Sequence, residues 1–529
     1  MSAAAPAIVK QKLDKGPSKM GTVVFAAVLL VGFIYTVFHL ASDLASVRTS
    51  SVFPFILLGA ALLVALGFEF VNGFHDTANA VATVIYTHTM DPHLAVAWSG
   101  IWNFIGVMFS TGAVAFGIVA LLPVELILQV GTSAGFAMVF ALLLAAMVWN
   151  IGTWYFGLPA SSSHTLVGSI VGVGIANQLM SHKTGMSGVD WTQAMNVGRS
   201  LLISPVIGFL LAGLLLLISK AVIKDRRLYE APATDDPPPF WIRGLLMVTC
   251  TGVSFFHGSN DGQKGMGLIM LILIGTVPTA YALNHAVTES QTAQFMAVSQ
   301  QTVQVLNRYV TPSAFGGDPR EALTNYIRTK QYSGNTVSAL RAVVNDLSNE
   351  ANMYKTLAKI PTDRMRNFRN DMYITSEVLR LMGQSGRTDF TPAELQLLAT
   401  YKKQLDLATK FIPLWVKVAV ALALGLGTMI GWKRIVVTVG EKIGKGRLTY
   451  GQGAAAELTA MVTIGAADHF GLPVSTTHVL SSGVGGTMVA NRSGLQRITI
   501  RNILLAWALT LPASIILAGS LFWLLRNIF

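Results

Sequence analysis

Two short polar segments interrupt long apolar stretches of this chain, and each carries a carboxylate. The first is GFHDTANA at residues 73–80, and the second is GSNDGQKG at residues 258–265. An aspartate at the centre of a membrane-spanning helix costs roughly 2.5–3.5 kcal/mol on insertion scales. Because two matching segments each bear that cost, we expect an internal duplication with a polar site at its interface.

A second pair of segments supplies hydroxyl groups: FGLPASSSH at 156–164 matches FGLPVSTTH at 470–478. A proline followed by Ser or Thr at the start of an apolar run is typical of a helix N-terminus. The free N–H groups and partial positive charge of such an end favour an anion. We therefore predict two helix ends that grip opposite sides of one tetrahedral oxyanion; the alternative is that the hydroxyls are ordinary N-caps.

These four segments define the candidate site. The side chains expected to bind substrate are Asp76, Asn79, Ser161, Ser162, Ser163, Asp261, Lys264, Ser475, Thr476 and Thr477. Those expected to bind a proton or another cation are His75, Asp76, Asn260 and Asp261. An aspartate can accept a hydrogen bond from the OH of a protonated phosphate, which sulfate lacks at neutral pH. The alternative for the two aspartates is a structural pair bonded to backbone or to Lys264.

Histidines and glycines surround the same segments. His75 is either a proton carrier or a helix cap, whereas His164 and His478 are expected to fix their own loops by bonding backbone carbonyls. Glycines at 73, 258, 262, 265 and 267 are expected to let the backbone unwind there. Irregular backbone at membrane depth is tolerated only around a cavity.

The composition identifies the environment of these elements. Of 529 residues, 52% are hydrophobic and 12% are charged, against about 25% charged in soluble proteins. Windows of about 20 apolar residues recur, so we predict an all-α polytopic membrane protein. The net charge of +12 lies in short loops, which is typical of membrane topology and not of a nucleic-acid partner. The single cysteine, Cys250, excludes a disulfide framework, and we predict no metal site built by the protein.

We predict eleven spans, an anchor at about 21–42 followed by two sets of five. The predicted spans are 53–86, 94–121, 134–156, 164–180, 199–220, 242–280, 411–431, 453–470, 478–490 and 502–526. If the N-terminus is cytoplasmic, inside loops hold 17 basic residues and short outside segments hold four. That bias agrees with the positive-inside rule.

The spacing of the motifs locates an insert. The two aspartates are 185 residues apart and the two motif histidines 314, so 129 extra residues must be inserted between the two motifs of the second half. The polar stretch 284–410, with 15 basic and 11 acidic residues, fits that length and is predicted to be a soluble helical subdomain on the periplasmic side. An odd number of spans turns the second repeat upside down, which is the architecture of secondary transporters with discontinuous helices and a midplane site.

The expected organisation therefore has six parts. They are a tail and anchor at 1–50, the first repeat at 51–225, a cytoplasmic linker at 226–241, the first span of the second repeat at 242–283, the insert at 284–410 and the rest of the second repeat at 411–529.

The paired Gly-x-[His/Asn]-Asp-x-x-[Asn/Lys] and Gly-Leu-Pro-x-Ser-[Ser/Thr]-[Ser/Thr]-His elements resemble the inorganic phosphate transporter (Pit) family, in its bacterial low-affinity branch, over about 50–280 and 411–529. The resemblance implies symport of phosphate across a bacterial inner membrane, often as a neutral complex with Mg²⁺ or another divalent metal, driven by protons. His75 and Lys264 depart from the commoner pattern of the family. A lysine would repel sodium and a histidine titrates near neutral pH, so both favour proton coupling.

Other functions stay open at this stage. They are a sodium-coupled phosphate symporter, a sulfate permease of the same fold, an anion channel and an intramembrane hydrolase with a Ser–His pair. The hydrolase is disfavoured because the Ser/Thr-His element occurs twice, so we expect no enzyme and no cofactor. Expected partners are phosphate, a proton, a divalent metal and the bilayer. The sequence leaves open a homodimer and a gating role for the insert.

Overall fold

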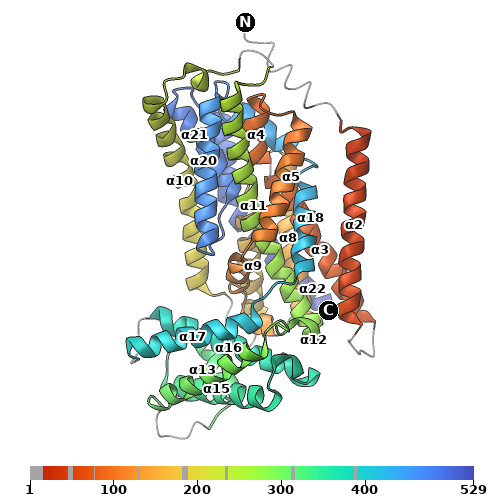
Figure 1. The fold of residues 1–529 in the computed structure, drawn as a ribbon, viewed down its shortest axis with the longest axis vertical. Helices are drawn as coiled ribbons and strands as arrows, with labels where there is room; N and C mark the ends of the chain where they lie inside the picture. Colours follow the sequence, from red (N-terminus) through yellow and green to blue (C-terminus); the bar gives the residue numbers. More distant parts are fainter. Residues whose placement is uncertain are drawn as a thin grey trace.

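The protein is described by a computed structural model, which covers residue 13 and residues 16–45, 52–76, 78–128, 131–180, 189–232, 236–310, 316–385 and 390–528. Within those ranges the chain is helical and forms no β-strand (Figure 1). A single bridge joins Gly444 and Leu495. The predicted all-α fold class is confirmed.

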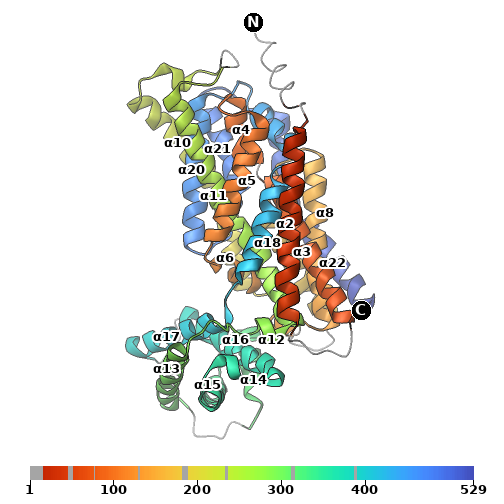
Figure 2. The ribbon, with the colours of Figure 1, turned by 45° about the vertical axis from the view of Figure 1, so that its right-hand side comes forward.

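The first long helix, α2 (Lys19–Leu44), stands at the side of the bundle beside α18 (Leu414–Gly427) and α3 (Phe53–Asp76) (Figure 2). Ser18 caps it by accepting a hydrogen bond from the Gly21 N–H at 3.0 Å. Most of its apolar side chains are exposed, as expected of a helix that faces lipid. It occupies the segment predicted to be the anchor.

The two repeats are built from corresponding helices. The first repeat holds α3 (Phe53–Asp76), α4 (Ala78–Tyr86), α5 (Pro92–Phe109), α6 (Ala113–Val119), α7 (Val124–Leu128), α8 (Ser133–Tyr155), α9 (Ser162–Met180) and α10 (Trp191–Val222). The second holds α11 (Phe240–Thr276), α18 (Leu414–Gly427), α19 (Lys433–Val437), a π-helical turn (Thr438–Lys442), α20 (Tyr450–His469), α21 (Thr476–Ala490) and α22 (Arg497–Ile528). A linker with the 3₁₀ turn Arg226–Tyr229 joins them.

The repeats exchange partners. Helix α10 packs along α21, and its counterpart α22 packs along α9. Glycines make both contacts close: a Cβ on Gly208 would lie 2.4 Å from the Val479 carbonyl oxygen, and one on Gly172 would lie 2.2 Å from the Ile515 carbonyl oxygen. Likewise α5 packs on α11 while α18 packs on α3. This reciprocal packing is the inverted-repeat arrangement that the sequence predicted.

Helices α8–α9 and α20–α21 form two hairpins whose tips lie inside the bundle. The Trp507 indole N–H, ten residues from the start of α22, donates to the Pro159 carbonyl oxygen at 2.8 Å. The Ser200 hydroxyl, nine residues from the start of α10, donates to the Pro473 carbonyl oxygen at 3.2 Å. At 1.5 Å per residue each tip is about 15 Å from the nearer end of the helix that holds it.

The hairpins account for a difference in span number. By length and composition, six helices of the described chain are able to cross a membrane, or up to eight if each of two bent pairs is one span. Eleven were predicted, and the three that do not qualify are α9, α20 and α21, all of them arms of the hairpins. One of the bent pairs is α5 and α6, at 77°. A hairpin that returns to its own side adds no net crossing, so the inversion of the second repeat is unaffected.

The predicted unwinding is absent from the second repeat, because α11 runs unbroken for 37 residues. In the first repeat, residue 77 between α3 and α4 lies outside the described residues, so the break expected there stays a prediction. The prediction of a discontinuous crossing at 242–280 was therefore wrong. The α11 glycines serve close packing instead: a Cβ on Gly258 would lie 2.2 Å from the Asn103 carbonyl oxygen, and one on Gly267 would lie 2.7 Å from the Ala115 carbonyl oxygen.

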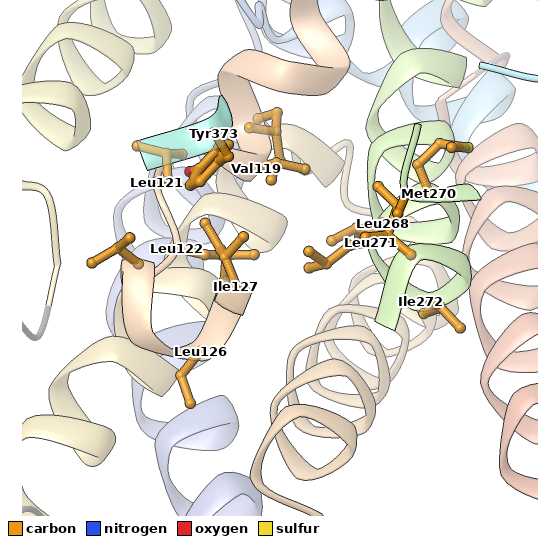
Figure 3. Packing of buried hydrophobic residues seen from close by; sticks show 14 of the residues in the cluster. Val119, Leu121, Leu122, Leu126, Ile127, Leu268, Met270, Leu271, Ile272 and Tyr373 are labelled. Carbon is orange, nitrogen blue, oxygen red and sulfur yellow. The ribbon is translucent and has the colours of Figure 1, made fainter. Parts of the chain in front are cut away.

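The chain between α11 and α18 forms a helical subdomain at the end of the molecule opposite the N-terminus (Figures 1 and 2). Its helices are α12 (Pro278–Tyr281), α13 (Glu289–Asn307), α14 (Pro319–Thr329), α15 (Gly334–Tyr354), the 3₁₀ turn Leu357–Lys359, α16 (Thr362–Ser385) and α17 (Pro392–Thr409). Figure 3 shows Tyr373 of α16 beside Val119 and Leu121, so the insert packs directly on the membrane-spanning part.

Polar contacts also fasten the insert. Asp190, which caps α10, accepts a hydrogen bond from the Lys330 ammonium at 2.9 Å and lies 3.5 Å from the Arg380 guanidinium. Burial opposes ionisation of this carboxyl, but the two cations and the Gln193 N–H outweigh it, so the pKa of Asp190 lies below its ordinary value of 3.8.

The close approach of α5 to α11 is testable by substitution. Gly258→Ala forces the two backbones apart and is expected to lower the free energy of unfolding by about 1–3 kcal/mol. Gly244→Ala, on the same helix, is the matched control, since a Cβ at that position meets no atom within 4 Å. Melting temperatures of the purified variants measure both. An unchanged value for Gly258→Ala would contradict the contact.

The insert contact should depend on pH. A depressed pKa means that ionised Asp190 stabilises the fold at neutral pH and that this contribution declines as the pH falls below about 3.8. Asp190→Asn is therefore expected to melt at a lower temperature than the parent at pH 7, with the difference vanishing in acid. Glu230→Gln, which removes an exposed carboxylate of the linker, is the control. A pH-independent difference would show that the charge is not responsible.

Candidate functional site

The tips of the two hairpins meet at Asp76, the last residue of α3. Its Oδ2 accepts a hydrogen bond from the Ser162 hydroxyl at 2.5 Å, and its Oδ1 accepts one from the Thr477 hydroxyl at 2.7 Å. Ser162 is the first residue of α9, and Thr477 is the second residue of α21. All three side chains are buried. One carboxylate thus joins the N-termini of both hairpin helices.

Asp261, in the middle of α11, brings the other repeat to the same point. Its Oδ2 lies 3.4 Å from the Ser162 hydroxyl, which therefore bridges the two aspartates. Its Oδ1 forms a 2.7 Å ion pair with the Lys264 ammonium, one turn further along α11. Lys264 is fully buried and also donates to the Ser163 hydroxyl. Asp261 is thus neutralised by its own helix.

Each aspartate also has a histidine. His75 Nδ1 lies 2.7 Å from Asp76 Oδ1, and its Nε2 lies 3.1 Å from the Thr153 hydroxyl. His257 Nε2 lies 3.7 Å from Asp261 Oδ2, and its Nδ1 lies 2.6 Å from the Asn103 side-chain oxygen. Sequence reasoning missed His257. The available signal was its spacing: His257 lies four residues before Asp261, and residues four apart share one face of a helix.

Three buried groups converge closely enough to share a cation. Asp76, His257 and Asp261 each offer a ligand atom, and all three atoms lie within 4.8 Å of one another. Carboxylate oxygens and an imidazole nitrogen suit divalent ions such as Zn²⁺ or Mn²⁺, and the oxygens suit Mg²⁺. The sequence predicted no metal site, so this group is a candidate that the structure adds.

Asn260 holds a hairpin rather than facing the aspartates. Its amide nitrogen donates to the Leu472 carbonyl oxygen at 3.1 Å, and its side-chain oxygen accepts from the Val474 N–H at 3.4 Å. Both partners belong to the tip between α20 and α21. The contact gives Asn260 a positioning role, while its predicted coupling role stays a prediction.

The remaining hydroxyls divide into caps and contacts. Ser161 accepts from the His164 N–H at 3.2 Å, and Ser475 accepts from the His478 N–H at 3.1 Å, so both are N-caps. The Ser163 hydroxyl donates to the Val474 carbonyl oxygen at 2.8 Å.

The Thr476 hydroxyl is buried and has no hydrogen-bond partner among the residues that the structure describes. It is thus a donor at the N-terminus of α21 that a ligand can use.

Two other expectations concern side chains around the tips. His164 Nδ1 contacts the Ser161 hydroxyl at 2.8 Å, and the His164 and His478 rings face each other with centroids 4.6 Å apart. The expected bonds to backbone carbonyls are replaced by this pairing across the two tips. Asn79, predicted to bind substrate, lies outside the described side chains.

The arrangement can hold unlike charges together. Two helix N-termini and the Lys264 ammonium favour an anion, while Asp76 and Asp261 favour a cation or an acidic proton. In the described state the Ser162 and Thr477 hydroxyls donate to Asp76. An entering oxyanion has to take over those donors.

Known proteins are similar to this chain in sequence and in fold. Residues 72–518 match the profile described as the phosphate transporter family. The chain is 41% identical over 490 residues to the low-affinity inorganic phosphate transporter PitA of Escherichia coli strain K12, covering 89% of this chain and 96% of that protein. PitB of the same strain is 40% identical over 493 residues, covering 89% and 97%.

More distant relatives extend the comparison. A probable low-affinity inorganic phosphate transporter of Bacillus subtilis is 27% identical, covering 90% of this chain and 98% of that protein. A solved structure described as the sodium-dependent phosphate transporter matches with a TM-score of 0.50 at 20% identity, covering 90% of this chain and all of that one. At that identity the similarity shows the fold alone.

Proposed function

This chain belongs to the phosphate transporter family, and from that premise we propose that it imports inorganic phosphate by proton symport through alternating access. The protein is a multi-pass membrane protein whose named relatives are transporters. Transport rather than catalysis is accordingly its proposed role.

The observation that carries the proposal is the bridge that Ser162 makes between Asp76 and Asp261. It joins one carboxylate from each inverted repeat at the start of a hairpin helix. A protonated phosphate suits this mixture, because its bare oxygens accept from hydroxyls and helix N–H groups while its OH donates to a carboxylate. Sulfate has no OH at neutral pH and would face the carboxylates without a donor. The alternative is that the protein transports sulfate.

Charge around the site favours a proton as the coupling ion. Asp261 already has a cationic partner in Lys264 at 2.7 Å, which competes with sodium for that carboxylate. Asp76 has His75 at 2.7 Å, and the imidazole provides a second position for a proton beside the carboxylate. Sodium coupling is the alternative, and a solved structure of similar fold is described as sodium-dependent.

A divalent metal is proposed as cargo alongside phosphate. The Asp76, His257 and Asp261 atoms that lie within 4.8 Å of one another supply donors for such an ion. Phosphate bound beside it would complete its coordination, and the pair would cross as one nearly neutral unit. Neutrality lowers the cost of moving the pair through a membrane.

The proposed topology follows the predicted one. Figures 1 and 2 show the insert at the end of the molecule opposite the N-terminus. With the N-terminus in the cytoplasm of a bacterium, the insert lies on the periplasmic side of the inner membrane. Rocking of the inverted repeats about the hairpin tips would then open the site to either side in turn.

The coupling ion is tested in sodium-free proteoliposomes with magnesium, labelled phosphate and an inward proton gradient. Proton symport predicts concentrative uptake that a protonophore abolishes. Competition by sulfate at equal concentration is expected to be weak. Uptake that begins only when sodium is added would overturn the proton assignment, and equal competition by sulfate would overturn the substrate assignment.

The two aspartates are tested by Asp76→Asn and Asp261→Asn. Each change removes the charge that the hydroxyls and Lys264 surround, and uptake is expected to fall more than about tenfold. The amount of protein in the membrane should be unchanged. Asp91→Asn is the control, since Asp91 is exposed and its side chain makes no cap hydrogen bond. Normal uptake by either aspartate variant would overturn the assignment of that aspartate to the transport site.

A further inference from the structure

A cavity of about 270 Å³ lies where the insert meets the membrane-spanning part. Helices α6 and α11 form one wall, from Ala113 to Ala120 and from Gly267 to Ile274. Helices α16 and α17 form the other, with Arg369, Tyr373 and Lys410 among its residues. Figure 3 shows the Tyr373 ring next to Val119 and, across from them, the α11 side chains. Insert and bundle thus build one chamber.

The chamber adjoins the central site. Gly267, in its wall, is one turn beyond Lys264 on the unbroken α11. Ala113, also in its wall, touches the second hairpin tip: a Cβ on Gly471 would lie 3.1 Å from the Ala113 Cβ. The tip leads directly into Ser475, Thr476 and Thr477. The chamber therefore lies between the insert side of the membrane and the site.

Two of the three cations in the chamber have carboxylate partners. Arg380 donates to Glu377 at 2.7 Å and lies 3.5 Å from Asp190. Lys410 lies 3.0 Å from Asp406 and 3.9 Å from Glu377. Within these pairs the charges neutralise each other, and the pairs hold the walls of the chamber in position.

Arg369 differs from them. Its side chain is only 5% exposed, and no described carboxylate lies within ion-pair distance of it. Its Nε has no hydrogen-bond partner within the described chain, and its Nη1 reaches only the Asn370 side-chain oxygen at 3.4 Å. The guanidinium stands 5.0 Å from the Tyr373 ring centroid, which supplies a weak cation–π contact.

Such a group requires an anion. Burying a guanidinium without a charged partner is expensive. Burial lowers the pKa of Arg369 to about 10, so the side chain still carries its charge at neutral pH. A planar guanidinium with unused donors matches a phosphate oxyanion, to which it can donate two parallel hydrogen bonds.

We propose that Arg369 binds phosphate in this chamber and delivers it to the hairpin tips, so that the insert forms an entry site for substrate. The inference rests on the proposed function, because it takes phosphate as substrate and the insert side as the side of entry. The neighbouring Glu377 and Asp406 limit the affinity, which suits a site that ions pass through. A lipid phosphate headgroup offers the same chemistry and is the other source to be tested.

The kinetic test compares phosphate uptake by cells that express the parent protein, Arg369→Gln, Arg369→Lys or Arg364→Gln. Arg369→Gln is expected to raise KM about tenfold with the maximal rate within about twofold of the parent. Arg369→Lys keeps the charge without the paired donors and should raise KM less. Arg364→Gln, the control, removes an exposed arginine of the same helix that pairs with Glu350 outside the chamber.

The outcomes separate the two proposals. No phosphate uptake by the parent would overturn the proposed function. Normal parental uptake with an unchanged KM in Arg369→Gln, or a lower maximal rate at unchanged KM, would overturn the entry site alone. An equal rise in KM for Arg364→Gln would also overturn it, since the effect would then reflect net charge.

A binding test on the parent protein covers the case in which Arg369→Gln does not fold. Arg369 is labelled with phenylglyoxal in phosphatidylcholine liposomes and mapped by mass spectrometry. Inorganic phosphate is expected to reduce labelling of Arg369 and not of Arg364. Protection by added phosphatidylglycerol without any protection by phosphate would assign the site to a lipid and overturn the proposal.

Discussion

Two aspartates buried within a membrane-spanning bundle require donors on every side, and much of the structure supplies them. Asp76 receives hydroxyls from both hairpin helices, and Asp261 receives an ammonium from its own helix. To reach Asp76, the hairpins must turn inside the bundle, where α22 and α10 hold their tips through Trp507 and Ser200. The exchange of α10 and α22 between repeats follows from that need, because each braces the hairpin of the other half.

The frame is symmetric but its chemistry is not. Aligned on the aspartates, His75 corresponds to Asn260 and Asn79 to Lys264. His75 contacts the aspartate beside it, whereas Asn260 turns away to hold a hairpin tip. Asp76 therefore pairs with an imidazole at 2.7 Å, whereas Asp261 pairs with an ammonium at 2.7 Å and has its own imidazole, that of His257, further away at 3.7 Å. Duplication supplied two equivalent positions, and substitution gave them different electrostatic properties that a coupled transporter can use.

Sequence patterns predicted the membrane character, the inverted repeats, the insert and the motifs that meet at the tips. They did not distinguish a re-entrant hairpin from two crossings, because α8 is long and apolar enough to cross a membrane although it is one arm of a hairpin. The glycines of α11 were misinterpreted, since a residue without a side chain serves both unwinding and close packing. The structure distinguishes the two roles at Gly258, because the Asn103 carbonyl of α5 lies where a Cβ would be. His257 was missed although it lies four residues before Asp261 on the same helix, because its other partner, Asn103, comes from α5 and gives no signal near it in the sequence.

The opposed hairpins also determine where the membrane voltage acts. Each hairpin enters the bundle from the end of the holding helix that is farther from the tip, so each tip lies past the middle of that helix. The barrier between the two sides of the membrane is therefore short compared with the length of the bundle. Where water enters behind each hairpin, the electric field concentrates across the few residues between the tips. A charge that moves past Asp76 would then experience most of the potential, about 2.3 kcal/mol per 100 mV, over a small displacement. Under that condition, a small displacement of a charge between the tips would cross nearly the full membrane potential.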